Sequence, residues 1–70
     1  MRGEIEPHDR PGQVALYLTR AELLLLAGSV NEAIEAVDDW EFPARVGTGK
    51  ADARALRAEL AGLIAGLPPE

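Results

Sequence analysis

The longest regular pattern of hydrophobic positions runs from residue 48 to residue 67. Its large apolar residues recur at spacings of three, four and seven, which predicts one long helix over about 49–67, with Thr48 as its N-cap. The opposite side of this helix carries almost only small residues: Ala51, Ala55, Ala58, Gly62 and Gly66. Two explanations of this small face are open. Alanine is abundant there because of its high helix propensity, or small side chains let a second helix approach closely. We therefore treat Ala51, Ala55, Ala58 and Gly62 as candidate interface residues.

Two capping-box patterns precede the long helix. Thr19 is followed three residues later by Glu22, and Ser29 is followed in the same way by Glu32. These patterns predict helices over about 20–27 and 30–40, and Gly28 between them favours a break over one bent helix. The second helix is expected to stop before Pro43.

A strand is predicted over about 13–18, where Val14, Leu16 and Leu18 alternate with smaller or more polar residues. A lone strand leaves backbone polar groups unpaired. Three alternatives remain open. The strand pairs with residues 3–6 in a hairpin, pairs with the same strand of a second subunit, or leads directly into the helix. We favour the second.

The predicted fold is mainly α: a small bundle of three helices with a short N-terminal strand or arm. Residues 1–12 are expected to be a flexible or weakly paired arm that contains a loop over 8–12. Residues 13–67 form a single helical domain, and 68–70 are a tail. The predicted core consists of Leu16, Leu18, Leu23, Leu24, Ile34, Val37, Leu56, Leu60, Leu63 and Ile64.

Composition narrows the classes of function. Seventy residues form a marginal core, so a partner subunit is a plausible source of stability. The chain has no cysteine and one histidine, and we expect no metal, cofactor, catalytic residue or small-molecule substrate. The net charge of −5 argues against a nucleic-acid partner. No apolar run is long enough to span a membrane, so we expect a cytoplasmic protein. The composition is typical of a bacterial protein.

Two groups of residues are candidate contact sites. Trp40 and Phe42 at the end of the second helix form either a hydrophobic plug or an interface anchor, and Tyr17 on the strand is a weaker anchor. Glu32, Glu35 and Asp39 lie on one acidic face, which is either simply solvated or a docking face for a basic partner.

Two further motifs do not match the functional sites that they resemble, a phosphate-binding loop and a metal site. The run Gly47-Thr48-Gly49-Lys50 lacks the spacing of a phosphate-binding loop, and Glu4, Glu6 and His8 supply only one nitrogen ligand for a metal. The sequence is therefore interpreted as a non-enzymatic, self-associating protein–protein interaction module: an adaptor, a regulator or an antitoxin-like partner. It is expected to form a homodimer, to bind another protein, or both. The alternative is a small helix-turn-helix-like DNA-binding regulator.

Overall fold

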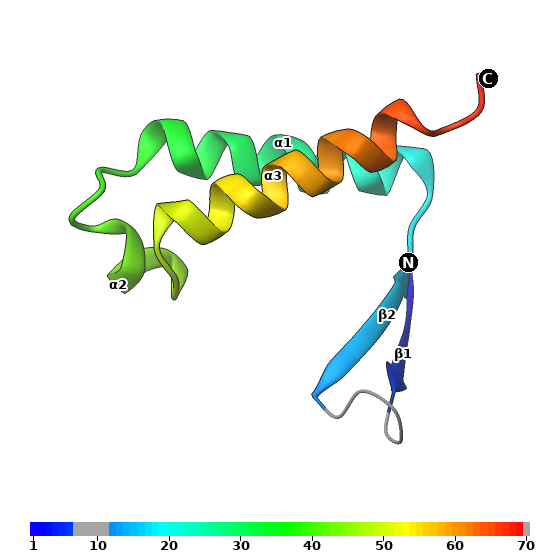
Figure 1. Cartoon of the computed structure of the whole chain (residues 1–70), viewed down its shortest axis with the longest axis horizontal. Helices are drawn as coiled ribbons and strands as arrows, with labels where there is room; N and C mark the ends of the chain where they lie inside the picture. Colours follow the sequence, from blue (N-terminus) through cyan, green and yellow to red (C-terminus); the bar gives the residue numbers. More distant parts are fainter. Residues whose placement is uncertain (7–11, 70) are drawn as a thin grey trace.

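The computed structural model describes residues 1–6 and 12–69. In chain order its elements are β1 (Arg2–Glu6), β2 (Gln13–Tyr17), α1 (Arg20–Ala36), α2 (Phe42–Val46) and α3 (Lys50–Ala65). α1 and α3 lie side by side in opposite directions, and the hairpin of β1 and β2 projects from the end where α1 begins (Figure 1). The mainly helical class with an N-terminal strand is confirmed. The predicted loop at 8–12, apart from Gly12, lies outside the described residues, as does residue 70 of the predicted tail.

The first capping box forms as predicted. The Thr19 hydroxyl accepts a hydrogen bond from the backbone N–H of Glu22 at 3.1 Å, and the Glu22 carboxylate accepts one from the backbone N–H of Thr19 at 2.9 Å. Two otherwise unpaired donors are satisfied at the start of α1, which fixes where the helix begins.

The predicted break after residue 27 is wrong. α1 continues through Gly28 to Ala36, so the two expected helices over 20–27 and 30–40 are one helix that ends earlier than predicted. The Ser29 hydroxyl does not cap a new helix but donates to the carbonyl of Leu25 at 2.8 Å. Buried residues on both sides of Gly28, Leu23 and Ile34, hold the helix together, because packing outweighs the weak propensity of one glycine.

The expected stop at Pro43 is also corrected, since Phe42–Val46 form the short helix α2. Pro43 lies in its first turn, where a missing backbone N–H removes no helical hydrogen bond. Gly47 ends the helix at φ 96°, a left-handed conformation that glycine adopts without steric penalty. Gly49, not Thr48, is the N-cap of α3, and the Thr48 hydroxyl donates instead to the carboxylate of Asp52.

Phe42 lies at the centre of the core. It is fully buried and packs with Ile34 of α1 and Ala53 of α3, surrounded by the half-buried Val30, Ala33 and Val37. The prediction of a hydrophobic plug is therefore confirmed for Phe42, whereas its alternative role as an interface anchor stays a prediction. Trp40 does not belong to the plug, because 79% of it is exposed.

The predicted core is only partly correct. Leu23, Ile34 and Leu60 are buried, and Leu18, Val37 and Ile64 are half-buried. The remaining predictions are wrong for the isolated chain, because these side chains are exposed: Leu16, Leu24, Leu56 and Leu63. The hairpin projects away from the helices, so no further layer covers them in the described part of the chain (Figure 1).

Of the three alternatives for the predicted strand, the structure has the hairpin, in which residues 13–17 form β2. β1 and β2 pair antiparallel, with Ile5 opposite Val14 and Gly3 opposite Leu16. The preference for pairing with a second subunit in place of this hairpin is therefore wrong. Within the described residues β2 has no neighbour on its other edge.

Replacing Phe42 by Ala should reduce the free energy of unfolding by about 3–5 kcal/mol, because it empties the centre of the core. The change is measured by urea unfolding followed by circular dichroism. Trp40→Ala is the matched control and should change stability by less than about 0.5 kcal/mol. An equal loss in both variants would contradict the assignment of Phe42 as the central core residue.

Candidate interaction surfaces

The side of the helix pair from which the hairpin projects carries two adjoining grooves, which together we call the inner surface. The first, of about 390 Å³, lies between the three helices and is lined by Ser29, Val30, Ala33, Phe42, Val46, Thr48, Asp52, Ala53 and Leu56. The second, of about 340 Å³, lies between the hairpin and α1 and is lined by Met1, Leu16, Leu18, Glu22, Leu25, Leu26 and Ser29. Because Ser29 lines both, the two grooves form one continuous surface.

Large apolar side chains on the inner surface remain in contact with solvent. Leu25 is 72% exposed, Leu16 is 52% exposed and Leu56 is 44% exposed. Leu63 follows Leu56 by seven positions on the same side of α3 and is 60% exposed. An exposed apolar area of this kind marks a contact surface more often than a solvated one.

The sequence contains a signal for this surface that helical spacing alone does not reveal. Residues 23–26 are four consecutive leucines. Successive residues of a helix are rotated by about 100°, so four of them cover most of its circumference and cannot all face one neighbour. In the structure Leu23 faces the core, while Leu24, Leu25 and Leu26 are exposed.

Polar groups in the grooves already have partners within the chain. Ser29 donates to the Leu25 carbonyl, and Thr48 donates to Asp52. Since these groups are hydrogen-bonded internally, what the inner surface offers to a partner is mainly hydrophobic area.

Glu22 has a second contact besides the capping box. Its carboxylate accepts a hydrogen bond from the N-terminal ammonium of Met1 at 2.7 Å, and this contact connects the hairpin to the first turn of α1. The ammonium, followed by the backbone N–H of Thr19, lowers the pKa of Glu22 from 4.5 to about 2.

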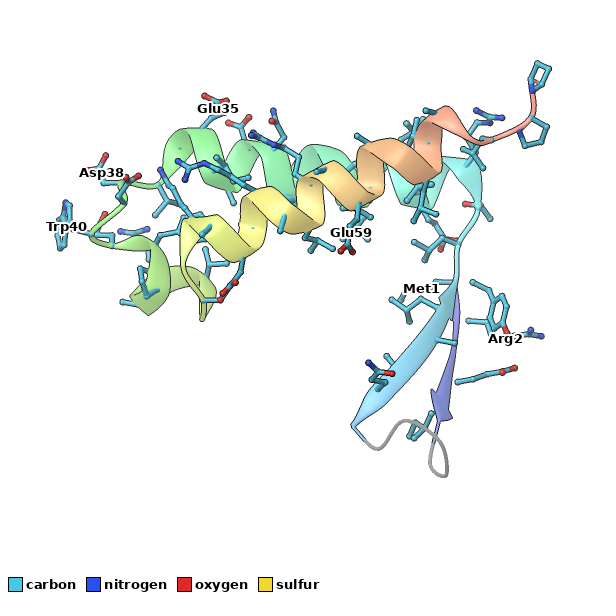
Figure 2. The ribbon with its side chains drawn as sticks, viewed as in Figure 1. Met1, Arg2, Glu35, Asp38, Trp40 and Glu59 are labelled. Atoms are coloured by element: carbon cyan, nitrogen blue, oxygen red, sulfur yellow. The ribbon has the colours of Figure 1, made fainter. Side chains whose placement is uncertain are left out.

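The two faces of the hairpin differ in polarity. Ile5, Val14 and Leu16 lie on one face, which belongs to the same side as the second groove. On the other face the Arg2 guanidinium lies 4.5 Å from the centre of the Tyr17 ring and 3.6 Å from the Glu4 carboxylate. Figure 2 shows Met1 and Arg2 on opposite sides of the hairpin. Tyr17, a candidate anchor, therefore lies on the polar face, under Arg2.

Trp40 projects from the far end of the helix pair, the same end as Asp38, whereas Glu35 lies further along α1 (Figure 2). Of the predicted acidic face, Glu32, Glu35 and Asp39 are all exposed. Asp39 is not free, because the Lys50 ammonium lies 2.8 Å from its carboxylate and lowers its pKa.

Lys50 is held in place by the core as well as by Asp39. Only 13% of its side chain is exposed, and its ammonium lies 5.7 Å from the centre of the Phe42 ring. Arg45 is a second basic residue near this acidic end. Its guanidinium lies 3.5 Å from Glu41, one helical turn earlier. Part of the acidic end is thus neutralised within the chain.

The small face of α3 lies away from α1. Ala51, Ala55, Ala58 and Gly62 are all exposed, on the side of the helix opposite the buried Ala53 and Leu60. The chain itself therefore leaves two surfaces of α3 uncovered, one with large apolar residues and one with small residues.

One basic residue of α3 has a side-chain partner on α1. The Arg57 guanidinium donates to the side-chain carbonyl of Asn31 at 3.0 Å, across the contact between α3 and α1.

Among the described residues, no three potential metal ligands lie together. None of the described helices has the length and apolar character needed to cross a membrane.

The charge on Glu22 should stabilise the fold in a pH-dependent way. A carboxyl whose pKa falls from 4.5 to about 2 on folding contributes fully above about pH 5, and this contribution disappears as the pH falls toward 2. The variant Glu22→Gln keeps a capping amide and removes the charge. Its melting temperature should lie below that of the wild type at pH 6, and the difference should shrink toward pH 2. Glu32→Gln is the control. A difference for Glu22→Gln that stays constant with pH would contradict the ion pair.

Comparison of the chain with protein-family models gave no match, and neither the curated proteins nor the solved structures compared with it matched. Its function is therefore inferred from the surfaces described above.

Proposed function

We propose that the chain is a non-enzymatic protein–protein interaction module that self-associates as a homodimer through its inner surface. Such a module acts as an adaptor, a regulator or an antitoxin-like partner. The observation that carries the proposal is the exposed apolar area of the inner surface. The absence of cysteine is compatible with a cytoplasmic location.

The large accessible surface area of the chain supports the proposal that a partner covers part of it. It amounts to 5475 Å², whereas a folded monomer of 7.5 kDa has about 4,200 Å². The excess is about 1,200 Å², and a stable interface of standard size buries about 800 Å² from each partner. The radius of gyration agrees, at 13.9 Å against about 11 Å for a compact domain of 70 residues.

The inner surface is a better candidate for this interface than the small face of α3. Burial of apolar area contributes about 25 cal/mol per Å², and leucine side chains offer far more of it than alanine or glycine. Leu25 and Leu56 lie on the inner surface, whereas Ala55 and Ala58 represent the small face.

The composition of the grooves supports a binding rather than a catalytic role. Ser29, the hydroxyl shared by both grooves, donates to a backbone carbonyl, and the described lining residues include no histidine to activate it. Nucleophilic catalysis by serine needs a base within hydrogen-bond reach.

Light scattering across a hundredfold concentration range tests self-association. The wild type should have the mass of a dimer at high concentration. Leu25→Glu should raise Kd at least about 100-fold, because burying an unpaired carboxylate costs several kcal/mol. Its helical content should be unchanged, since Leu25 is 72% exposed in the single chain.

Ala58→Arg is the matched control on the small face and should leave the dimer intact. If Ala58→Arg dissociated the dimer and Leu25→Glu did not, the small face would be the interface. A wild type that stays monomeric at every concentration would refute self-association altogether.

A further inference from the structure

The outer edge of β2 is the part of the hairpin least protected against pairing. Sheet edges that stay free are usually guarded by charged side chains, proline or bulges. β1 has such protection in Arg2 and Glu4, whereas β2, with the sequence Gln-Val-Ala-Leu-Tyr, contains no charged residue. Within the described residues, β2 pairs with β1 alone.

The hairpin also lacks enough contacts to be stable by itself. A two-stranded sheet in water is marginal, and three or more strands with a covered apolar face are normally needed. Here the apolar face is open, with Ile5 77% exposed and Val14 60% exposed. Additional strands are therefore the contact that this element needs.

We infer that β2 pairs antiparallel with β2 of a second copy of the chain, which joins the two hairpins into one four-stranded sheet, β1-β2-β2-β1. This inference rests on the proposed self-association and specifies which backbone edge the two copies share. The strand that pairs with β1 inside the chain thus also pairs with its counterpart across the dimer.

Side-chain alternation sets the register of this pairing. Directly opposite residues of two paired strands point to the same face, so Val14 and Leu16 must oppose residues of the same apolar face in the other copy. Centring the pair on Ala15 satisfies this condition and uses all five residues of β2: Ala15 faces Ala15, Val14 faces Leu16, and Gln13 faces Tyr17 of the second copy. A shift by one residue would place the apolar faces on opposite sides.

The alternative edge fits a second copy less well. Pairing of β1 with β1, centred in the same way, would place Glu4 opposite Glu4, and like charges directly opposite are destabilising. Arg2 is already engaged with Glu4 at 3.6 Å and with Tyr17 at 4.5 Å. Pairing at Ala15 instead brings small uncharged residues together at the two-fold axis.

The proposed sheet also orients the inner surfaces. A two-fold axis through Ala15, perpendicular to the sheet, places the apolar faces of both hairpins on the same side. Leu16 lines the groove that leads to α1, so both helix pairs lie on that side as well. The two inner surfaces then face each other from opposite ends of the sheet, as the proposed dimer requires.

Disulfide formation at Ala15 tests the register, because the natural chain contains no cysteine. Residues directly opposite in antiparallel strands have Cα atoms about 4.5–5.5 Å apart, within the range of a disulfide. At about 10 micromolar protein, Ala15→Cys should cross-link under mild oxidation roughly 100-fold faster than Ala58→Cys, because paired thiols have an effective concentration near millimolar. The mass of the wild type is measured in parallel.

The outcomes separate the two proposals. A monomeric wild type refutes self-association and this inference together. A dimeric wild type with Ala15→Cys cross-linking no faster than Ala58→Cys refutes the strand pairing alone. If the cysteine variant folds poorly, Ala15→Lys and Ala15→Glu replace it: each alone should weaken the dimer, and mixing them should restore it. Failure of the mixture to associate more strongly than either variant would overturn the register.

Discussion

Burial of Phe42 between α1 and α3 is the contact on which the helical part of the molecule depends. The short helix α2 carries this side chain under the helix pair, and Pro43 and Gly47 define where that helix begins and ends. Lys50 then covers the ring while it pairs with Asp39. A charged residue thus closes the core at an end where the described residues supply no further apolar layer, because the lysine stem is apolar and only its ammonium needs a polar partner.

The short chain limits how many other hydrophobic residues can be buried. The buried hydrophobic residues of the described chain are few: Leu23, Ile34, Phe42, Ala53 and Leu60. Two helices packed along one stripe leave the rest of their apolar residues uncovered, and the hairpin adds area instead of removing it. The same sequence that builds a narrow core therefore also produces a wide apolar surface, and the proposed dimer is the way to cover it.

Local signals in the sequence were sufficient for the helical class, the first capping box and the long C-terminal helix. They failed where a distant contact decides the structure. Gly28 and Ser29 match the local pattern of a helix boundary, yet burial of Leu23 on one side and Ile34 on the other keeps the helix continuous. Pro43 matches the local pattern of a helix stop, although proline is equally suited to the first turn of a new helix. Exposure of Leu56 and Leu63 depends on whether another element covers that side of α3, which spacing along the chain does not encode.

Trp40 has a practical consequence, because it is the only tryptophan and most of its indole is in water. Its fluorescence in the native chain should resemble that of an unfolded peptide, so emission will report little about denaturation even as the core around Phe42 comes apart. The same property makes the indole a clean optical probe of its own corner. A blue shift on mixing with another molecule would mean that something has covered this end of the helix pair, without any label attached to the chain.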